Sequence, residues 1–209
     1  MAPVHFLDNR SLVADASFWI NIIAGGRAEE VLRALCNPLQ IPRIALDELE
    51  RGRDKGRATA QALTHLIEAD LVRVIDLPET AEGTFLSLVA GAISQTLDDG
   101  EAATLALSLE IGGCAIIDER KAISLAASRF PKLLVVTTSD LLLSEPIRTA
   151  LSPRELSDLF FAALTNARMR VPEHLLETVC ECIGKNRVSQ CVSLPARVRN
   201  TAEGEQCGS

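Results

Sequence analysis

Short apolar runs alternate with segments of helical apolar spacing over about the first two thirds of the chain. One predicted strand ends at residue 14, and the other four are expected at 39–41, 71–75, 114–117 and 133–136. A helix is expected to open at Pro42, because proline is well placed in a first helical turn. The remaining helices are predicted at 17–24, 28–36, 58–69, 78–93, 101–111 and 119–128. This alternation predicts right-handed βαβ crossovers and a mostly parallel sheet in an α/β fold.

The pattern changes at two places. Residues 51–57 (RGRDKGR) are polar, basic and broken by glycine, which predicts a link between helices. After about residue 150, two amphipathic helices are expected at 152–168 and 172–183, followed by a polar, irregular sequence. We therefore expect an α/β domain over residues 1–150, a helical extension over 151–185 and a flexible tail over 186–209.

The predicted extension carries an apolar face of large side chains. This face could complete the core, form a homodimer contact or receive a partner helix, and packing within the chain is the preferred interpretation. Its residues are Leu156, Leu159, Phe160, Phe161 and Leu164.

Composition supports a filled aliphatic core. Hydrophobic residues make up 47% of the 209 residues and aromatic residues only 3%, which favours an α/β protein over a β-sandwich. No apolar stretch approaches the roughly 18–20 residues of a membrane span, and the opening MAPVHFLDNR lacks the features of a signal peptide. We expect a cytoplasmic protein that does not associate with membranes.

Charge and cysteine content narrow the function. The net charge of 21 − 28 = −7 argues against a protein that simply coats nucleic acid, although it allows a nuclease whose metal reverses the local sign. The six cysteines include no CxxC pair and the three histidines are scattered, so the sequence does not favour structural zinc.

Four acidic residues stand where a predicted strand passes into a helix, or just inside the helix that follows. They are Asp15, Glu48, Glu101 and Asp118. Ligands of parallel α/β sheets bind beyond the carboxyl ends of the strands, so these side chains could gather there. Carboxylates gathered in one place repel one another, and a divalent cation with oxygen ligands is the usual means of neutralising them.

Each acid also has a structural explanation. Asp15 and Asp118 could be helix N-caps, and Glu101 follows Asp98 by the three residues of a capping box. Glu48 near a helix start would complement the helix dipole. For each acid taken singly, the structural explanation is preferred over a metal site. The ordered combination of the four motifs shifts the preference toward a metal site.

Four motifs around these acids resemble the PIN domain family of metal-dependent nucleases over about residues 12–136. The motifs are VADASFWINI, ALDELERG, DDGEAATLALSLEIG and AIIDERKAISLA. The resemblance implies a five-stranded parallel sheet of order 3-2-1-4-5 in a three-layer α/β/α arrangement. It also implies that one or two Mg²⁺ or Mn²⁺ ions are held by Asp15, Glu48, Glu101 and Asp118. With these ions the protein would act as an endoribonuclease that hydrolyses RNA phosphodiester bonds. VapC-type toxins of this family usually end soon after the fifth strand, whereas this chain continues for about seventy residues.

Further candidates flank the acids. Thr137, Thr138 and Ser139 follow the fifth predicted strand and could contact phosphate or water, although a helix cap explains them better. A basic group following Glu48 could contact the RNA backbone, although a solvated loop explains it equally well. This group consists of Arg51, Arg53, Lys55 and Arg57.

The sequence features bear on three candidate functions. The first is the metal-dependent ribonuclease, which could be a toxin with an antitoxin protein as its partner. The second is a PIN-like module that binds RNA or protein without cutting. The third is a flavodoxin-like or Rossmann-type nucleotide-binding domain, which the absence of GxGxxG and GxxxxGK[ST] disfavours.

Overall fold

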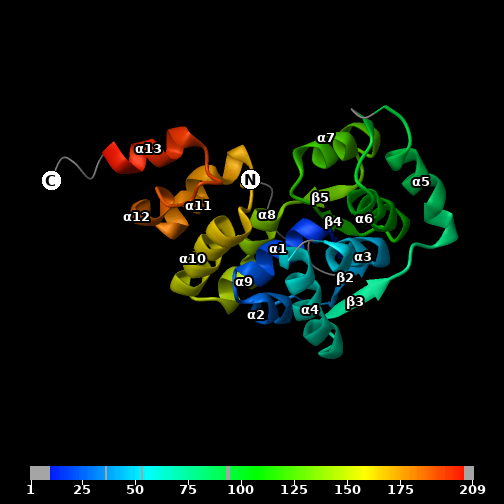
Figure 1. The fold of residues 1–209 in the computed structure, drawn as a ribbon, viewed down its shortest axis with the longest axis horizontal. Helices are drawn as coiled ribbons and strands as arrows, with labels where there is room; N and C mark the ends of the chain where they lie inside the picture. Colours follow the sequence, from blue (N-terminus) through cyan, green and yellow to red (C-terminus); the bar gives the residue numbers. More distant parts are fainter. Residues whose placement is uncertain (1–9, 36, 53, 93–94, 205–209) are drawn as a thin grey trace. The chain divides into compact units, whose positions relative to one another are not determined.

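Five short parallel strands form the sheet that organises the N-terminal part of the chain (Figure 1). The computed structural model describes residues 10–35, 37–52, 54–92 and 95–204. The strand order is β3-β2-β1-β4-β5, as the resemblance implied. The strands are β1 (Leu12–Ala14), β2 (Leu39–Pro42), β3 (Val72–Ile75), β4 (Cys114–Ile116) and β5 (Leu134–Val136).

The central strand β1 is buried along its whole length. Its Val13 lies opposite Gln40 of β2 and Ala115 of β4, so β1 has a parallel neighbour on both sides. A strand covered on both faces must be apolar throughout, which is why the sequence shows continuous aliphatic runs rather than alternation.

Helices connect the strands and continue after β5. The connecting helices are α1 (Ala16–Ala24), α2 (Ala28–Arg33), α3 (Arg43–Arg51), α4 (Asp54–Glu68), α5 (Glu79–Val89), α6 (Asp99–Glu110) and α7 (Arg120–Arg129). Those after β5 are α8 (Thr138–Leu142), α9 (Glu145–Ala150), α10 (Pro153–Ala162), α11 (Leu176–Ile183), α12 (Lys185–Val188) and α13 (Ala196–Gly204). A π-helical turn (Ala163–Ala167) follows α10, and a 3₁₀ turn (Glu173–Leu175) precedes α11.

Helix α6 is the buried helix of the sheet-containing part. It packs on β1, β2 and β4 and contacts α3 and α5. Its small residues Ala102, Ala103 and Ala106 are almost fully buried, which allows close approach to the sheet. A helix buried on nearly every side needs apolar residues all round, and this explains its alanine-rich sequence.

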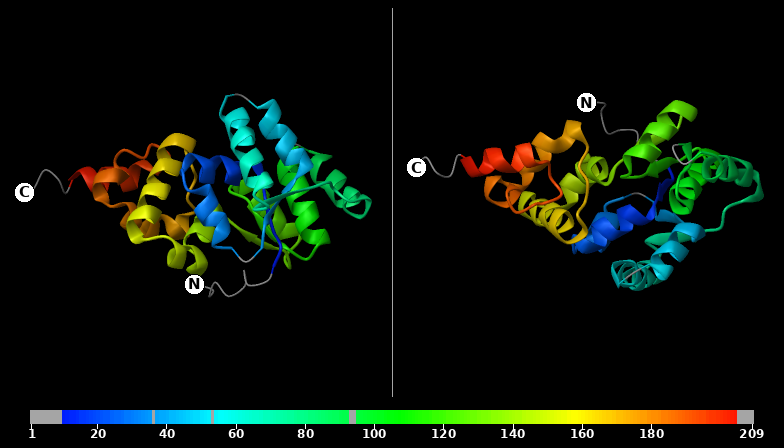
Figure 2. Two further views of the ribbon diagram at one scale, coloured as in Figure 1. Left: turned by 90° about the horizontal axis from the view of Figure 1, so that it is seen from below. Right: turned by 45° about the horizontal axis from the view of Figure 1, so that its top comes forward.

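The link expected at residues 51–57 was wrong for most of its length. Helix α3 ends at Arg51 and α4 already begins at Asp54, so the helices lie side by side with a very short connection (Figure 2). Gly56 lies inside α4, and a Cβ there would come within 2.8 Å of the Leu49 carbonyl oxygen. Glycine therefore serves close packing of α4 on α3 and does not break the helix.

The chain divides into two compact units. One comprises residues 1–20 and 35–138, with the whole sheet, and the other comprises residues 21–34 and 139–209. This division differs from the expected boundaries at 150 and 185, because the segment containing α2 groups with the C-terminal helices. Helix α13 occupies part of the region expected as a flexible tail, and residues 205–209 lie outside the described part.

The apolar face of the C-terminal helices packs within its own unit. Leu159, Phe160 and Leu164 are fully buried. A Cβ at Gly25 would come within 3.0 Å of the Leu159 Cγ, so α10 lies directly against the segment that follows α1. The preferred expectation of packing within the chain is therefore confirmed.

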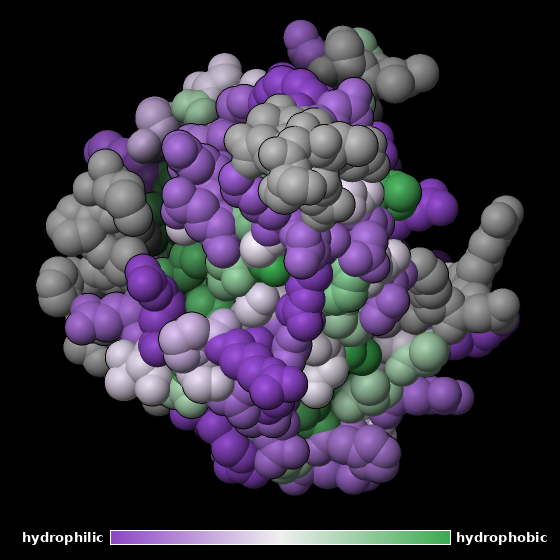
Figure 3. Space-filling model, turned by 90° about the vertical axis from the view of Figure 1, so that its left-hand side faces the viewer, coloured by the Kyte–Doolittle hydropathy of each residue, from purple (hydrophilic) through white to green (hydrophobic). Residues whose placement is uncertain are grey.

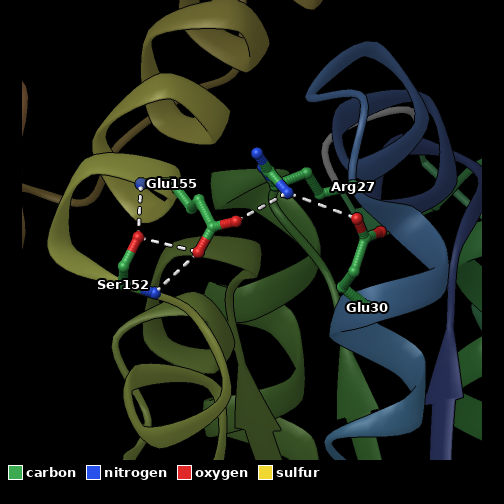
Figure 4. Close-up of polar contacts among 4 residues, drawn as sticks. All are labelled: Arg27, Glu30, Ser152 and Glu155. Atoms are coloured by element: carbon green, nitrogen blue, oxygen red, sulfur yellow. Dashed lines mark hydrogen bonds and ion pairs between the residues drawn. The ribbon is translucent and has the colours of Figure 1, made fainter.

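A polar network also joins distant segments of this unit (Figure 4). Ser152 and Glu155 form a capping box at the start of α10, and the Ser152 hydrogen bonds are the main reason that the pKa of Glu155 is lowered. The Arg27 guanidinium lies 3.1 Å from the Glu155 carboxylate and 3.3 Å from that of Glu30. Arg27 thereby connects the start of α2 to the start of α10.

The C-terminal helices also form a groove of about 890 Å³. Its walls come from α11, α12 and α13, with apolar Leu176 and Val188 beside charged Glu177 and Lys185. On the face that Figure 3 presents, hydrophilic side chains predominate and apolar ones are visible in hollows between them. Within the described residues, no helix is both long and apolar enough to cross a membrane.

Candidate functional site

Asp15 follows β1 directly and precedes the first residue of α1. Its carboxylate accepts hydrogen bonds from the Phe18 backbone N–H at 3.0 Å and from the Ser17 hydroxyl at 2.8 and 2.9 Å. The bond from the third helical residue is that of an N-cap, so the structural explanation offered for Asp15 is correct. The side chain is only 3% exposed, which is unusual for a simple cap.

Asp118 lies just beyond β4 and has a different set of partners. Its carboxylate accepts the Thr138 backbone N–H at 2.8 Å and the Thr138 hydroxyl at 2.6 Å. The N-cap position of α7 belongs to Glu119, so the capping explanation was wrong for Asp118. Asp118 and Thr138 instead connect the ends of β4 and β5.

Glu48 reaches the site from the middle of α3. Its Oε1 accepts the backbone N–H of Gly100, the second residue of α6, at 3.0 Å. Burial raises the pKa of Glu48, and the Gly100 hydrogen bond opposes that effect. The expectation that Glu48 complements the dipole of its own helix was therefore wrong. Its carboxylate lies instead at the start of a different helix, α6.

Glu101 is the third residue of α6 and makes half of the expected capping box. A hydrogen bond from the Asp98 backbone lowers the pKa of Glu101, whereas the Asp98 side chain makes no capping bond. The pKa of Glu101 is nevertheless raised to about 7, mainly by burial and in addition by the Asp98 and Glu119 carboxylates. A reciprocal capping box is therefore absent at this helix.

The structure brings the four predicted acids into one electrostatic cluster at the carboxyl end of the sheet. The pKa of Asp15 is raised to about 7, mainly by burial and in addition by the negative charges of Asp118 and Glu101. The charge of Glu48 in turn raises the pKa of Glu101. The strongest opposing effects on Asp15 and Glu101 come from hydrogen bonds rather than from lysine or arginine. A bound cation would relieve this repulsion.

The donor chemistry of this cluster suits a divalent cation. In the described part of the chain, no three His, Cys, Asp or Glu side chains are arranged as a ready-made metal-binding group. Mg²⁺ does not need one, because it commonly binds through one or two carboxylates and keeps several waters. The buried, mutually repelling oxygens of Asp15 and Asp118 are the best placed to provide such ligands.

The other predicted contacts are distributed unevenly. The Thr138 hydroxyl is committed to Asp118, and Thr137 is buried beside it. The Ser139 hydroxyl is buried without a hydrogen-bond partner among the described residues. Ser139 belongs to the other compact unit, whose second segment begins at that residue.

The basic group is only partly described. Arg51 is exposed, donates to the Asp47 carbonyl at 3.0 Å and lowers the pKa of Glu48. Arg57 is exposed on α4. Arg53 and the side chain of Lys55 lie outside the described residues.

Besides Phe18, whose backbone N–H caps Asp15, two residues with direct hydrogen bonds to the acids were missed. Ser17 donates to Asp15, and Gly100 donates to Glu48. Both lie in the quoted motifs next to an acid, in DAS and DGE. That proximity was the available signal, but for Gly100 the partner is 52 residues away and cannot be read from the motif.

Comparison with known proteins agrees with the fold. The family model DUF3368, described as a PIN domain, matches residues 11–185. No curated protein sequence matches the chain. The family match covers the sheet, the four acids and most of the C-terminal helices. The chain therefore belongs to the PIN domain family.

Proposed function

We propose that the protein is a metal-dependent endoribonuclease that hydrolyses RNA phosphodiester bonds. One or two Mg²⁺ or Mn²⁺ ions would be held by Asp15, Glu48, Glu101 and Asp118. The observation that carries the proposal is the clustering of buried and partly buried carboxylates at the carboxyl end of a PIN-domain sheet, where the charges of Asp118 and Glu101 raise the pKa of Asp15 and the charge of Glu48 raises that of Glu101. Such an arrangement costs stability unless a cation compensates for it.

The protein's own residues would hold and orient oxygen atoms. Thr138 fixes both oxygens of Asp118, and Ser17 with the Phe18 N–H orients Asp15. A divalent ion held by these oxygens would supply the chemistry of a water of lowered pKa and would offset negative charge at the leaving oxygen. The chemistry therefore requires no nucleophilic side chain.

Basic residues near the acids would contact the RNA backbone. Arg51 lies three residues after Glu48 and is exposed, and Arg57 is exposed on the next helix. Arg53 and Lys55 retain the same proposed role on sequence grounds. A phosphate or water contact by Thr137, Thr138 or Ser139 is also proposed, with the Thr138 hydroxyl already engaged by Asp118.

The test is cleavage of labelled single-stranded RNA by purified protein. Cleavage is expected with Mn²⁺ or Mg²⁺, should stop with EDTA and should be lost in Asp15→Asn. Glu68→Gln is the matched control, because Glu68 is an exposed acid on α4 that pairs with His65 one helical turn earlier. Equal cleavage by Asp15→Asn and the control would overturn the assignment.

A non-catalytic PIN-like module that binds RNA or protein is the second candidate. The observation in its favour is that no three metal-binding side chains form a ready-made group among the described residues. This second function predicts that the protein binds the labelled RNA and leaves it uncleaved. Calorimetric titration with Mn²⁺ separates the two functions, since a binding module need not take up metal.

A narrower form of the nuclease proposal is a cytoplasmic toxin with an antitoxin partner. It predicts that expression of the wild-type chain, and not of Asp15→Asn, arrests bacterial growth. Co-expression of a small antitoxin from the flanking reading frame should then restore growth. Homodimer formation is a separate prediction that sedimentation analysis would check.

A further inference from the structure

The backbone at Gly100 makes an unusually close approach to the carboxylate of Glu48. The Gly100 N–H donates to Glu48 Oε1 at 3.0 Å, and both residues are at least partly buried. A Cβ built at position 100 would collide with Glu48 Oε2 and lie 3.1 Å from its Cδ. Glu48 therefore occupies the space that any other side chain at residue 100 would need.

We infer that Gly100 is a positioning residue that places the Glu48 carboxylate beside Glu101. Its consequence for catalysis rests on the proposed nuclease function, whereas the contact itself does not. Gly100 contributes through its N–H, which orients one oxygen, and through its missing side chain, which leaves room for the other. Helix α6 thus carries Glu101 itself and fixes Glu48 through the preceding residue.

The steric conflict is specific to Glu48. The nearest other atom to a Cβ at residue 100 is Ala45 Cα at 3.5 Å, an ordinary van der Waals contact. The colliding atoms belong to the end of a flexible side chain and not to the backbone. Gly100→Ala should therefore fold, with the Glu48 carboxylate displaced, because alanine is also the better helix former.

Displacing Glu48 would change the acid cluster without removing a carboxylate. Glu48 would lose the Gly100 N–H, and its charge would move away from Glu101, whose pKa it raises. Groups that orient metal ligands typically contribute about 10–100-fold to metal affinity. Gly100→Ala should therefore weaken Mn²⁺ binding by about tenfold and lower kcat more than it raises KM for RNA.

The experiment is a double-mutant cycle on the full chain with Gly100→Ala, Glu48→Ala and the double variant. Thermal midpoints without metal and Mn²⁺ affinities by calorimetry are the two readouts. Gly83→Ala is the matched control, because Gly83 also lies within a helix and a Cβ there would meet nothing within 4 Å. This control should bind Mn²⁺ like the wild type.

The expected result is non-additivity. Gly100→Ala should lower the midpoint more with Glu48 present than in the Glu48→Ala background, and it should weaken Mn²⁺ binding only when Glu48 is present. Glu48→Asp in the Gly100→Ala background should recover part of the affinity, because the shorter side chain withdraws from the added methyl group. Equal midpoint changes in both backgrounds would overturn the inference.

The two proposals can fail separately. If the wild type neither binds Mn²⁺ nor cleaves RNA, the proposed function fails, and a non-additive midpoint cycle still supports the Gly100–Glu48 contact. If the wild type cleaves RNA while the cycle is additive, the nuclease function stands and the positioning role is refuted.

Discussion

Thr138 donates two hydrogen bonds to Asp118, from its backbone N–H at 2.8 Å and from its hydroxyl at 2.6 Å. Both side chains are buried, and the two residues follow the neighbouring strands β4 and β5. Each carboxylate oxygen therefore has a fixed donor before any ligand binds. Asp118 is therefore oriented by a backbone donor and a side-chain donor together, as Asp15 is by Phe18 and Ser17.

Replacing Thr138 tests this arrangement. Thr138→Val keeps the N–H and the shape but removes the hydroxyl donor to a buried carboxylate. We expect the free energy of unfolding to fall by about 1–3 kcal/mol, and Thr138→Ser to recover most of it. Urea denaturation measures both variants, and a valine variant as stable as the wild type would show that the hydroxyl contact contributes nothing.

The pH dependence of stability tests the burial of Asp15. Its pKa is raised from 3.8 to about 7, mainly by burial, so the folded protein retains a proton that the unfolded chain loses first. Stability of the metal-free protein should therefore fall as the pH rises from about 4 to 7, and Glu101 contributes in the same direction. Asp15→Asn cannot ionise and still accepts the Phe18 N–H.

We expect the free energy of unfolding of Asp15→Asn at pH 8 to exceed that of the wild type by on the order of 2 kcal/mol. We also expect its free energy of unfolding to depend less on pH. Thermal melts in EDTA across this pH range provide the measurement. Glu68→Gln, the exposed control, should follow the wild type at every pH. If the stability of the wild type instead rises steadily from pH 4 to 7, the raised pKa of the buried Asp15 carboxyl would be contradicted.

Metal should reverse the same penalty. Carboxylate ligands must lose their protons before they bind a cation, so Mn²⁺ should raise the thermal midpoint more at pH 8 than at pH 6. EDTA should remove the effect, and Asp15→Asn should show little of it. Calorimetry in two buffers of different ionisation enthalpy should detect proton release near neutral pH, and equal Mn²⁺ affinity at both pH values would argue against these ligands.

Two substitutions in the polar network at the start of α10 distinguish the stability contributed by a helix cap from that contributed by a surface ion pair. Ser152→Ala removes the cap and should lower the thermal midpoint by about 2–4 °C. Arg27→Ala should change it less, because its ion pairs with Glu30 and Glu155 are partly exposed. Melts at low and high salt provide the check, since only the Arg27 contribution should depend on ionic strength.

The periodicity of the chain predicted the strands well because buried parallel strands leave continuous aliphatic runs. It failed at residues 51–57, where polar residues and glycines suggested a link. The structure instead uses Gly56 to let α4 approach the Leu49 carbonyl. A glycine that breaks a helix cannot be told from one that permits helix packing by the sequence alone. Only the position of the neighbouring helix distinguishes the two roles.

The C-terminal helices show the same limit. Their amphipathic pattern predicted helices and a buried face, and Ser152-Pro153 indicated the start of α10. The pattern could not reveal that the opposing surface includes residues 21–34, because that partner is more than a hundred residues earlier in the chain. The boundary expected at residue 150 depended on sequence order alone.

The sequence by itself determined which acids could lie at the carboxyl edge of the sheet, since strand-to-helix junctions can be recognised from local residue order. The cap that holds Asp15 is local to its own helix and could be expected from the sequence, whereas tertiary structure alone decided that Thr138 holds Asp118 and that Gly100 holds Glu48. The reason is physical. Hydrogen bonding and burial depend on which segments pack together, and the parallel sheet brings together residues that are far apart in the chain.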